Sequence, residues 1–168
     1  MRRFFVVAAF VLAGVAACTD ATQEPEYLRR GLSADPATLD PQQARSVAAL
    51  KVLGELYEGL LTRDASGASV PGAAASWQVL GDGTRYLFTL RDDARWQDGS
   101  PVTADDFVRG WRHLVDPENA AFYADVLRPV VGAEAIAAGD AGPETLGIDA
   151  PDRRTVVVTL ARPQADFL

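Results

Sequence analysis

The sequence predicts an α/β fold, because segments with strand periodicity and segments with helical periodicity follow one another along the chain. Residues 84–91 place an apolar side chain at every second position, namely Tyr86, Phe88 and Leu90. That alternation is typical of a strand with one buried face. Apolar residues then recur at spacings of three and four between Phe107 and Val115, which is typical of an amphipathic helix. An Asp98-Gly99 turn separates the two elements.

The two ends of this helix carry their own signals. Thr103 occupies the N-cap position, and Asp106 can complete a capping box, although Glu or Gln is the usual residue there. Arg112 and His113 fall in the last turn, where a positive charge suits the helix dipole. Pro117 has no backbone N–H to donate, so we expect the helix to end before it.

Turn residues at 81–83 and at 151–153 predict two β-hairpins, because Gly and Asp accept the backbone angles of tight turns. The hairpin strands are expected at Ser76–Leu80 and Thr84–Arg91, and at Leu146–Ala150 and Thr155–Leu160. A first strand is expected at Tyr27–Leu32 and a short one at Leu60–Arg63, whereas Pro71–Ala75 is expected to be irregular.

A second amphipathic helix is predicted at Arg45–Leu60. Its apolar stripe consists of Val47, Leu50, Leu53, Leu56, Tyr57 and Leu60. Shorter helices are expected at Ala121–Leu127 and Val131–Ala138. Together these elements account for about one domain.

Composition excludes some classes of partner. Hydrophobic residues make up 48% of the 168, so the chain can form a core. Acidic residues outnumber basic ones by 23 to 16, which gives a net charge of −7. A nucleic-acid partner is not expected, because binding phosphate requires a basic surface.

Single copies of cysteine and histidine limit the possible chemistry. With Cys18 alone, an internal disulfide and a CxxC metal site are both impossible, and we expect no metal or other cofactor. A hydrolase with a histidine base would have to use His113. Its place at a helix end favours an exposed or dipole-stabilising role, and the nucleophile and phosphate-loop motifs are missing from the sequence.

Other chemically suggestive residues have structural interpretations. The adjacent pairs Asp92-Asp93 and Asp105-Asp106 cannot face each other across a substrate, and the second pair fits helix capping. The aromatic residues that could line a sugar or peptide site are Trp77, Trp96, Trp111, Tyr86, Phe88, Phe107, Phe122 and Tyr123. We expect Trp77, Phe88, Phe107 and Trp111 in the core, which leaves Trp96 and Tyr123 as the better candidates to face a ligand.

Residues 1–17 have the pattern of an export signal, with two arginines, an apolar run and a region of small residues. Val15-Ala16-Ala17-Cys18 resembles the bacterial lipobox, which implies cleavage before Cys18 and lipid modification of its thiol. A buried helix with a stray cysteine is the alternative. Residues 18–26 are small and polar and are expected to form a tether.

Several motifs in a fixed order resemble the N-terminal part of the solute-binding proteins of peptide ABC transporters, the oligopeptide/dipeptide-binding family. The motifs are Leu39-Asp40-Pro41, Leu56-Tyr57-Glu58-Gly59-Leu60-Leu61, Pro71-Gly72-Ala73-Ala74-Ala75-Ser76-Trp77, Tyr86-Leu87-Phe88-Thr89-Leu90-Arg91 and residues 96–107. Val115-Asp116-Pro117 with Phe122-Tyr123-Ala124 is most similar to the oligopeptide branch.

The resemblance implies a periplasmic-binding-protein-like (type II) fold, in which two α/β lobes close around a ligand by a hinge. Residues 27–168 would then hold the N-terminal part of lobe one plus the extra N-terminal subdomain. The solute-binding domain is expected to be incomplete, so that the sequence is a fragment of a longer protein.

The implied function is binding without chemistry. The protein would be a receptor of the periplasm or cell envelope, lipid-anchored to the membrane, that delivers oligopeptides to the permease subunits of an ABC transporter. By the resemblance, Arg45, Ser46 and Val47 form a loop against the bound peptide, and Tyr123 lines the same site. Some members of the family carry an acidic residue where this chain has Arg45.

Two alternatives stay open. The same fold could bind another solute, such as nickel, haem, a sugar or a signalling peptide. A cell-envelope hydrolase is the alternative from another class of protein.

Overall fold

The computed structural model describes residue 29 and residues 31–168. The expected signal peptide, lipidated Cys18 and tether lie outside the described residues. Most of the predicted strand at Tyr27–Leu32 also lies outside them, and its described residues, Arg29, Gly31 and Leu32, form no strand. The chain divides into two units, Met1–Leu32 and Ser33–Leu168, and the second is described below by itself.

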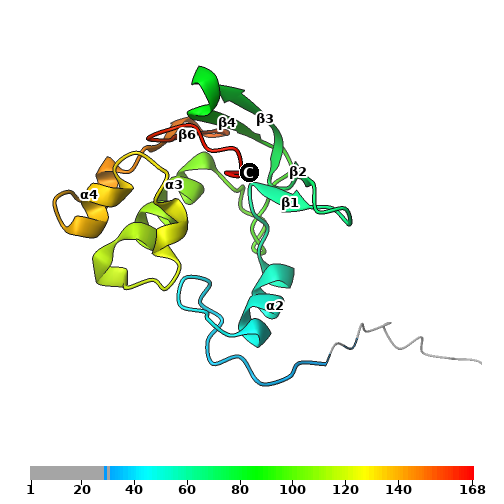
Figure 1. Ribbon diagram of the computed structural model, residues 1–168. Coiled ribbons are helices and arrows are strands. Elements are labelled where there is room, and N and C mark those ends of the chain that lie inside the picture. The colour runs from blue at the N-terminus through cyan, green and yellow to red at the C-terminus, as the bar shows by residue number, and fades with distance from the viewer. Residues whose placement is uncertain (1–28, 30) are drawn as a thin grey trace, which may run out of the picture. The chain divides into compact units, whose positions relative to one another are not determined.

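A four-stranded antiparallel sheet with the strand order β3-β4-β6-β5 is the main element (Figure 1). Its strands are β3 (Ala74–Leu80), β4 (Arg85–Leu90), β5 (Ile148–Asp152) and β6 (Thr155–Thr159). Both predicted hairpins are confirmed, and the structure pairs them through β4 and β6 in the centre of the sheet. In the first hairpin, Asp82 has φ of 56° between two glycines that also have positive φ, which explains the Gly-Asp-Gly turn.

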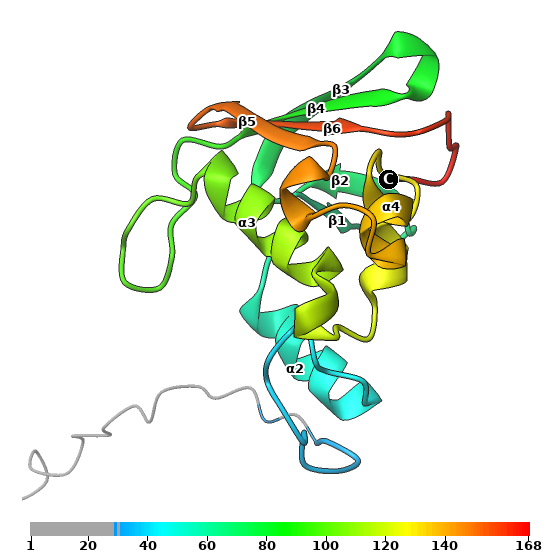
Figure 2. The ribbon, with the colours of Figure 1, turned by 90° about the vertical axis from the view of Figure 1, so that its left-hand side faces the viewer.

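One face of this sheet carries the core. Tyr86, Phe88 and Leu90 of β4 are buried there, as the alternation predicted, together with Val156 and Val158 of β6. Helices α3 (Ala104–Val115) and α4 (Ala133–Ala138) lie on the same side of the sheet (Figure 2) and contribute further buried side chains. The sheet and α3 therefore hold each other in place by apolar burial.

Helix α3 begins and ends where its signals predict. The backbone N–H of Thr103 donates to Oδ2 of Asp106 at 2.8 Å, which is the reciprocal half of a capping box. Arg112 and His113 lie in the last turn, and Pro117 opens the short 3-10 helix η3 (Pro117–Asn119).

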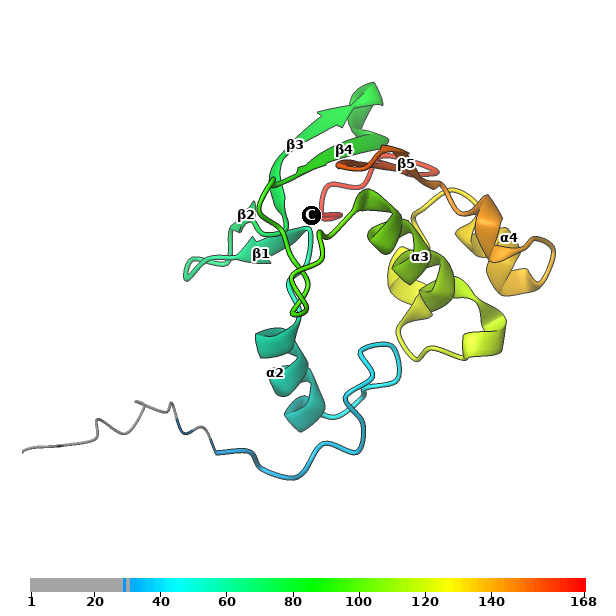
Figure 3. The same ribbon diagram turned by 180° about the vertical axis from the view of Figure 1, so that it is seen from behind.

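Helix α2 (Val47–Leu56) is shorter than the predicted Arg45–Leu60, since the backbone at Tyr57 is already extended. It lies away from the four-stranded sheet and leads into the two-stranded sheet of β1 (Leu61–Arg63) and β2 (Ser69–Pro71) (Figure 3). Residues 71–75, expected to be irregular, instead contain the end of β2 and the start of β3. The remaining short helices are 3-10 turns, η2 (Gly81–Gly83), η4 (Ala124–Leu127) and η5 (Pro143–Thr145).

The apolar stripe of α2 is mostly uncovered. Leu53 is buried in a small cluster with Ala44 and Ala49, but Val47 is 66% exposed and Leu56 is 61% exposed. Helical periodicity correctly predicted a helix here, yet the surface that this stripe would bury against is not among the described residues.

A search for membrane-crossing helices covers only the described part of the chain. No helix there is both long enough and apolar enough to span a bilayer.

Candidate ligand-binding site

The segment 45–47 forms the start of α2. Ser46 is the N-cap, and its Oγ accepts a hydrogen bond from the backbone N–H of Ala49 at 3.1 Å. This bond gives Ser46 a structural role, because an unmade cap would leave that donor unpaired. The side chains of Arg45 and Val47 are exposed on either side of it.

Arg45 and Tyr123 both contact Phe122. The Arg45 guanidinium carbon lies 4.7 Å from the centroid of the Phe122 ring, which is a cation–π distance. The Tyr123 ring meets the same Phe122 ring edge-on, with centroids 4.8 Å apart and an interplanar angle of 84°. We call these three side chains the Arg45 cluster, and all three are exposed. The structure thus brings together two residues that the sequence placed at one ligand site.

Two glutamines fix the segment before Arg45 against α3 and η3. Nε2 of Gln42 donates to the carbonyl oxygen of Gly110 at 3.0 Å, and Nε2 of Gln43 donates to that of Asn119 at 2.8 Å. The Asn119 amide in turn donates to Oε1 of Gln42 and to the carbonyl oxygen of His113. These contacts between distant segments explain why residue 45 meets residue 122.

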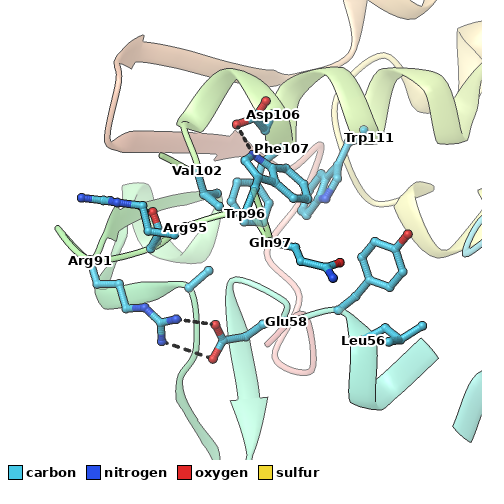
Figure 4. A pocket seen from close by; sticks show the side chains of 14 residues that line it. Leu56, Glu58, Arg91, Arg95, Trp96, Gln97, Val102, Asp106, Phe107 and Trp111 are labelled. Carbon is cyan, nitrogen blue, oxygen red and sulfur yellow. Dashed lines mark hydrogen bonds and ion pairs between the residues drawn. The ribbon is translucent and has the colours of Figure 1, made fainter. Parts of the chain in front are cut away.

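A cavity of about 480 Å³ lies between the end of α2, the turn at Trp96 and α3 (Figure 4). Its apolar wall consists of Leu56, Tyr57, Trp96, Val102, Phe107 and Trp111. Trp96, expected as a candidate to face a ligand, is 46% exposed and lines this cavity. Phe107 and Trp111, which were predicted to be core residues, pack against the core and also line this cavity. Phe88 is buried as predicted, and Trp77 is partly buried against the same core.

A tight turn aims Trp96 at the cavity. The backbone N–H of Trp96 donates to the carbonyl oxygen of Ser100 at 2.8 Å, and Asp98 accepts from the N–H and hydroxyl of Ser100. The two hydrogen bonds from Ser100 to the Asp98 carboxylate, that from the hydroxyl above all, lower the pKa of the exposed Asp98. Gly99 has φ of 84°, an angle that suits glycine, so the predicted Asp98-Gly99 turn is confirmed.

Charged groups at the cavity edge are paired within the protein. Arg91 contacts Glu58 at 2.9 Å and also donates to the carbonyl oxygen of Gly72 at 3.2 Å. The largest single influence on the pKa of Asp106 is partial burial, which raises it. Hydrogen bonds from the backbone and hydroxyl of Thr103 and from Trp96, together with the charge of Arg109, outweigh burial, so the pKa of Asp106 is lowered. These carboxylates serve the structure, as the sequence predicted for Asp106.

No hydrogen bond or ion pair joins the imidazole of His113 to an acid or a nucleophile among the described residues. His113 is exposed at the end of α3, and the hydrogen bond recorded there uses its backbone carbonyl. Within residue 29 and residues 31–168, no cluster of three or more His, Cys, Asp or Glu side chains could hold a metal ion. The Arg45 cluster and the cavity together present exposed aromatic and cationic side chains.

Comparison with known protein families identifies the family of this chain. The model of the bacterial extracellular solute-binding proteins, family 5 Middle, matches residues 68–168. The chain belongs to this family. The predicted resemblance to peptide-transporter solute-binding proteins is thereby confirmed at the level of family 5.

Relatives and solved structures agree with the assignment to family 5. The "probable deoxycholate-binding periplasmic protein YgiS" of Escherichia coli is 43% identical over 82% of this chain and 26% of its own length. The crystal structure of OppA from Haemophilus influenzae with the peptide RPPGFSPFR has a TM-score of 0.77 at 43% identity, over 80% of this chain and 26% of OppA. The substrate-binding domain of an oligopeptide ABC transporter from Bacillus anthracis has a TM-score of 0.73 at 37% identity, over 75% of this chain and 24% of that one.

These matches confirm the predicted fold class. The chain has the α/β fold of the type II periplasmic-binding-protein-like family members and spans about a quarter of their length. Of the Arg45 cluster, Phe122 and Tyr123 lie within the matched residues 68–168, whereas Arg45 lies before them. Phe122 was expected as one of several aromatic residues and as part of a family motif, but not as a contact residue, because nothing local in the sequence indicates that it contacts both other members of the cluster.

Proposed function

We propose that this chain is part of a periplasmic or cell-envelope receptor that binds oligopeptides and delivers them to an ABC permease. The receptor carries out no reaction. The peptide would be held in extended form through its backbone, with room for varied side chains. Arg45, Ser46, Val47 and Tyr123 are the proposed contact residues of this chain.

The Arg45 cluster is the observation that carries the proposal. Its members come from two distant segments of a family 5 chain, yet they meet on the surface and are not packed into the core. An exposed group of aromatic and cationic side chains is more typical of a recognition surface than of a stabilising one. The similarity to an OppA solved with a peptide supports peptide as the ligand.

Residues 27–168 are proposed to form one portion of a larger solute-binding domain. The exposed stripe of α2, which includes Val47, Leu50 and Leu56, continues into Tyr57 just after the helix and forms an apolar surface. The match to YgiS covers only 26% of that protein's length. We propose that the corresponding further polypeptide of this protein covers the stripe, since the apolar face of a helix is normally buried.

Export and anchoring are further parts of the proposal. Residues 1–17 would be removed as a signal peptide, Cys18 would be lipid-modified, and residues 18–26 would connect the anchor to the domain. A Cys18→Ser variant should lose incorporation of a radiolabelled fatty acid and leave the membrane fraction. Retention of both by the variant would contradict lipidation at Cys18.

One second ligand has a specific observation in its favour. The aromatic cavity between α2 and α3 suits an apolar ring system, and one relative is named as a probable deoxycholate-binding protein. Deoxycholate is therefore the natural competitor in any binding test.

The test is calorimetric titration of the protein produced from its complete reading frame. We expect saturable heat with a mixed pool of short peptides and none with deoxycholate, a sugar or nickel. A Tyr123→Ala variant should bind the pool more weakly, whereas Val79→Ala, an exposed apolar residue on β3, should not. Heat with deoxycholate and none with peptides would replace the proposed ligand.

A further inference from the structure

We infer that Arg45 makes the proposed peptide site selective for peptides that place a carboxylate group over the Arg45 cluster. The inference deepens the proposed function and rests on it. It names the ligand as an anionic peptide, with the charge supplied by an acidic side chain or by the terminal carboxylate.

The positive charge of Arg45 is not neutralised within the described residues. Three other arginines are paired with carboxylates, Arg91 with Glu58, Arg109 with Asp106 and Arg154 with Asp92. No ion pair or hydrogen bond joins the Arg45 side chain to any residue that the structure describes, and Arg45 is exposed. Its N–H groups are therefore available to a ligand.

The guanidinium is nevertheless held in a defined place. Its central carbon lies over the Phe122 ring, and that ring is contacted edge-on by Tyr123. The backbone on its two sides is fixed by the Gln43–Asn119 hydrogen bond and by the Ser46 cap. A positioned arginine loses less side-chain freedom on binding than a mobile one, so more of each new bond appears as affinity.

The chemistry of the Arg45 guanidinium points to a carboxylate. The cation–π contact uses no N–H hydrogen bond of the group. The N–H groups of a guanidinium match two carboxylate oxygens at once. An amide of the same shape can accept only at one oxygen and carries no charge. The site should therefore distinguish glutamate from glutamine, which have nearly the same size.

Two matched peptide pairs test the selectivity in the protein produced from its complete reading frame. Ala-Glu-Ala is compared with Ala-Gln-Ala, and Ala-Ala-Ala with its C-terminal amide, so that the pairs separate the two sources of the carboxylate. We expect the acid to bind about 10- to 150-fold more tightly than the neutral form in at least one pair, the range for hydrogen bonds to a charged partner. Equal affinities in both pairs would overturn the inference and leave peptide binding intact.

Variants assign the preference to Arg45. Arg45→Gln should abolish it, and Arg45→Glu should reverse it in favour of Ala-Lys-Ala. Arg128→Gln removes the same charge from the exposed residue after η4 and should leave the preference unchanged. Circular dichroism checks that each variant is folded.

Other outcomes would contradict either the role of Arg45 or peptide binding itself. A preference that persists in Arg45→Gln, or an equal loss of affinity for every peptide, would show that Arg45 does not select the charge. Failure of the parent protein to bind any peptide would overturn the proposed function itself.

Discussion

Arg45 and Phe122 are joined by a cation–π contact of 4.7 Å that links the start of α2 to the loop after η3. The contact joins residues from two segments that lie far apart in the sequence into one surface group. Because both partners are exposed, we expect it to be worth about 0.5–1 kcal/mol to the fold. Its main effect should therefore be on recognition.

Replacing Phe122 distinguishes a contribution to stability from a contribution to peptide recognition. Phe122→Leu should change the free energy of unfolding by less than about 1 kcal/mol, measured by urea denaturation, because an exposed ring buries little area. Peptide affinity should fall clearly, since the supports of both Arg45 and Tyr123 are lost. Val126→Leu, at another exposed apolar position nearby, is the control and should alter neither quantity. A large loss of stability in Phe122→Leu would mean that the cluster is structural.

The capping carboxylate of α3 predicts a pH dependence of stability. The pKa of Asp106 is lowered in the folded chain, so its contribution is present above the unfolded value and is lost as pH falls through the folded value. Asp106→Asn should cost about 1–2 kcal/mol at pH 7, and the difference from the parent should shrink as the pH falls below about 4.

Asp105→Asn is the control for this experiment. Asp105 lies in the same first turn but is exposed and makes none of the bonds of the capping box, so its replacement should cost less. Denaturation series from pH 7 to pH 2 measure both variants. A loss in Asp106→Asn that stays constant over this range would contradict the assignment.

Two glycines should respond to alanine in opposite directions. Gly132 has φ of 86°, and a Cβ there would lie 2.5 Å from the carbonyl oxygen of Thr145, so Gly132→Ala should cost at least about 2 kcal/mol. Gly110 lies within α3, and a Cβ there would meet nothing within 4 Å. Gly110→Ala should therefore raise the free energy of unfolding by up to about 1 kcal/mol. Urea denaturation of the two variants gives the comparison, and the same sign for both would contradict the backbone geometry.

In the 168-residue chain by itself, the stripe on α2 predicts a surface that binds hydrophobic dye. Leu50→Ser should reduce the fluorescence of a bound naphthalene sulfonate dye with little loss of helix, since Leu50 is 42% exposed. Leu53→Ala should instead weaken hydrogen-exchange protection of α2, because Leu53 is buried against Ala44 and Ala49. If Leu50→Ser weakened hydrogen-exchange protection of α2 as much as Leu53→Ala and left dye fluorescence unchanged, the stripe would be covered in solution.

Sequence periodicity predicted the hairpins and α3 because each buries one face in the same core. It predicted α2 too long, since Tyr57 and Leu60 continue the helical spacing although the backbone there is extended. Leu60 is buried in the main core while Val47 is exposed, so one stripe serves two environments that spacing alone cannot distinguish. Strand β2 was missed because it has three residues and ends in Pro71.

The candidate site was predictable only in part. Arg45 and Tyr123 came from the family resemblance, and nothing local in the sequence indicates that Phe122 would join them. Their meeting depends on side-chain hydrogen bonds of Gln42 and Gln43 to distant backbone atoms, which no local pattern encodes. The cavity likewise requires α3 and the turn at Trp96 to be in place.

Photo-crosslinking tests the central claim most directly. A tripeptide with a photoreactive aromatic residue is bound to the protein produced from its complete reading frame, irradiated, and the attachment points are found by mass spectrometry. We predict attachment to the segments that contain residues 45–47 and 122–123, suppressed by excess unlabelled peptide. Saturable attachment confined to the cavity at Trp96 and Trp111, or no saturable attachment at all, would contradict the account.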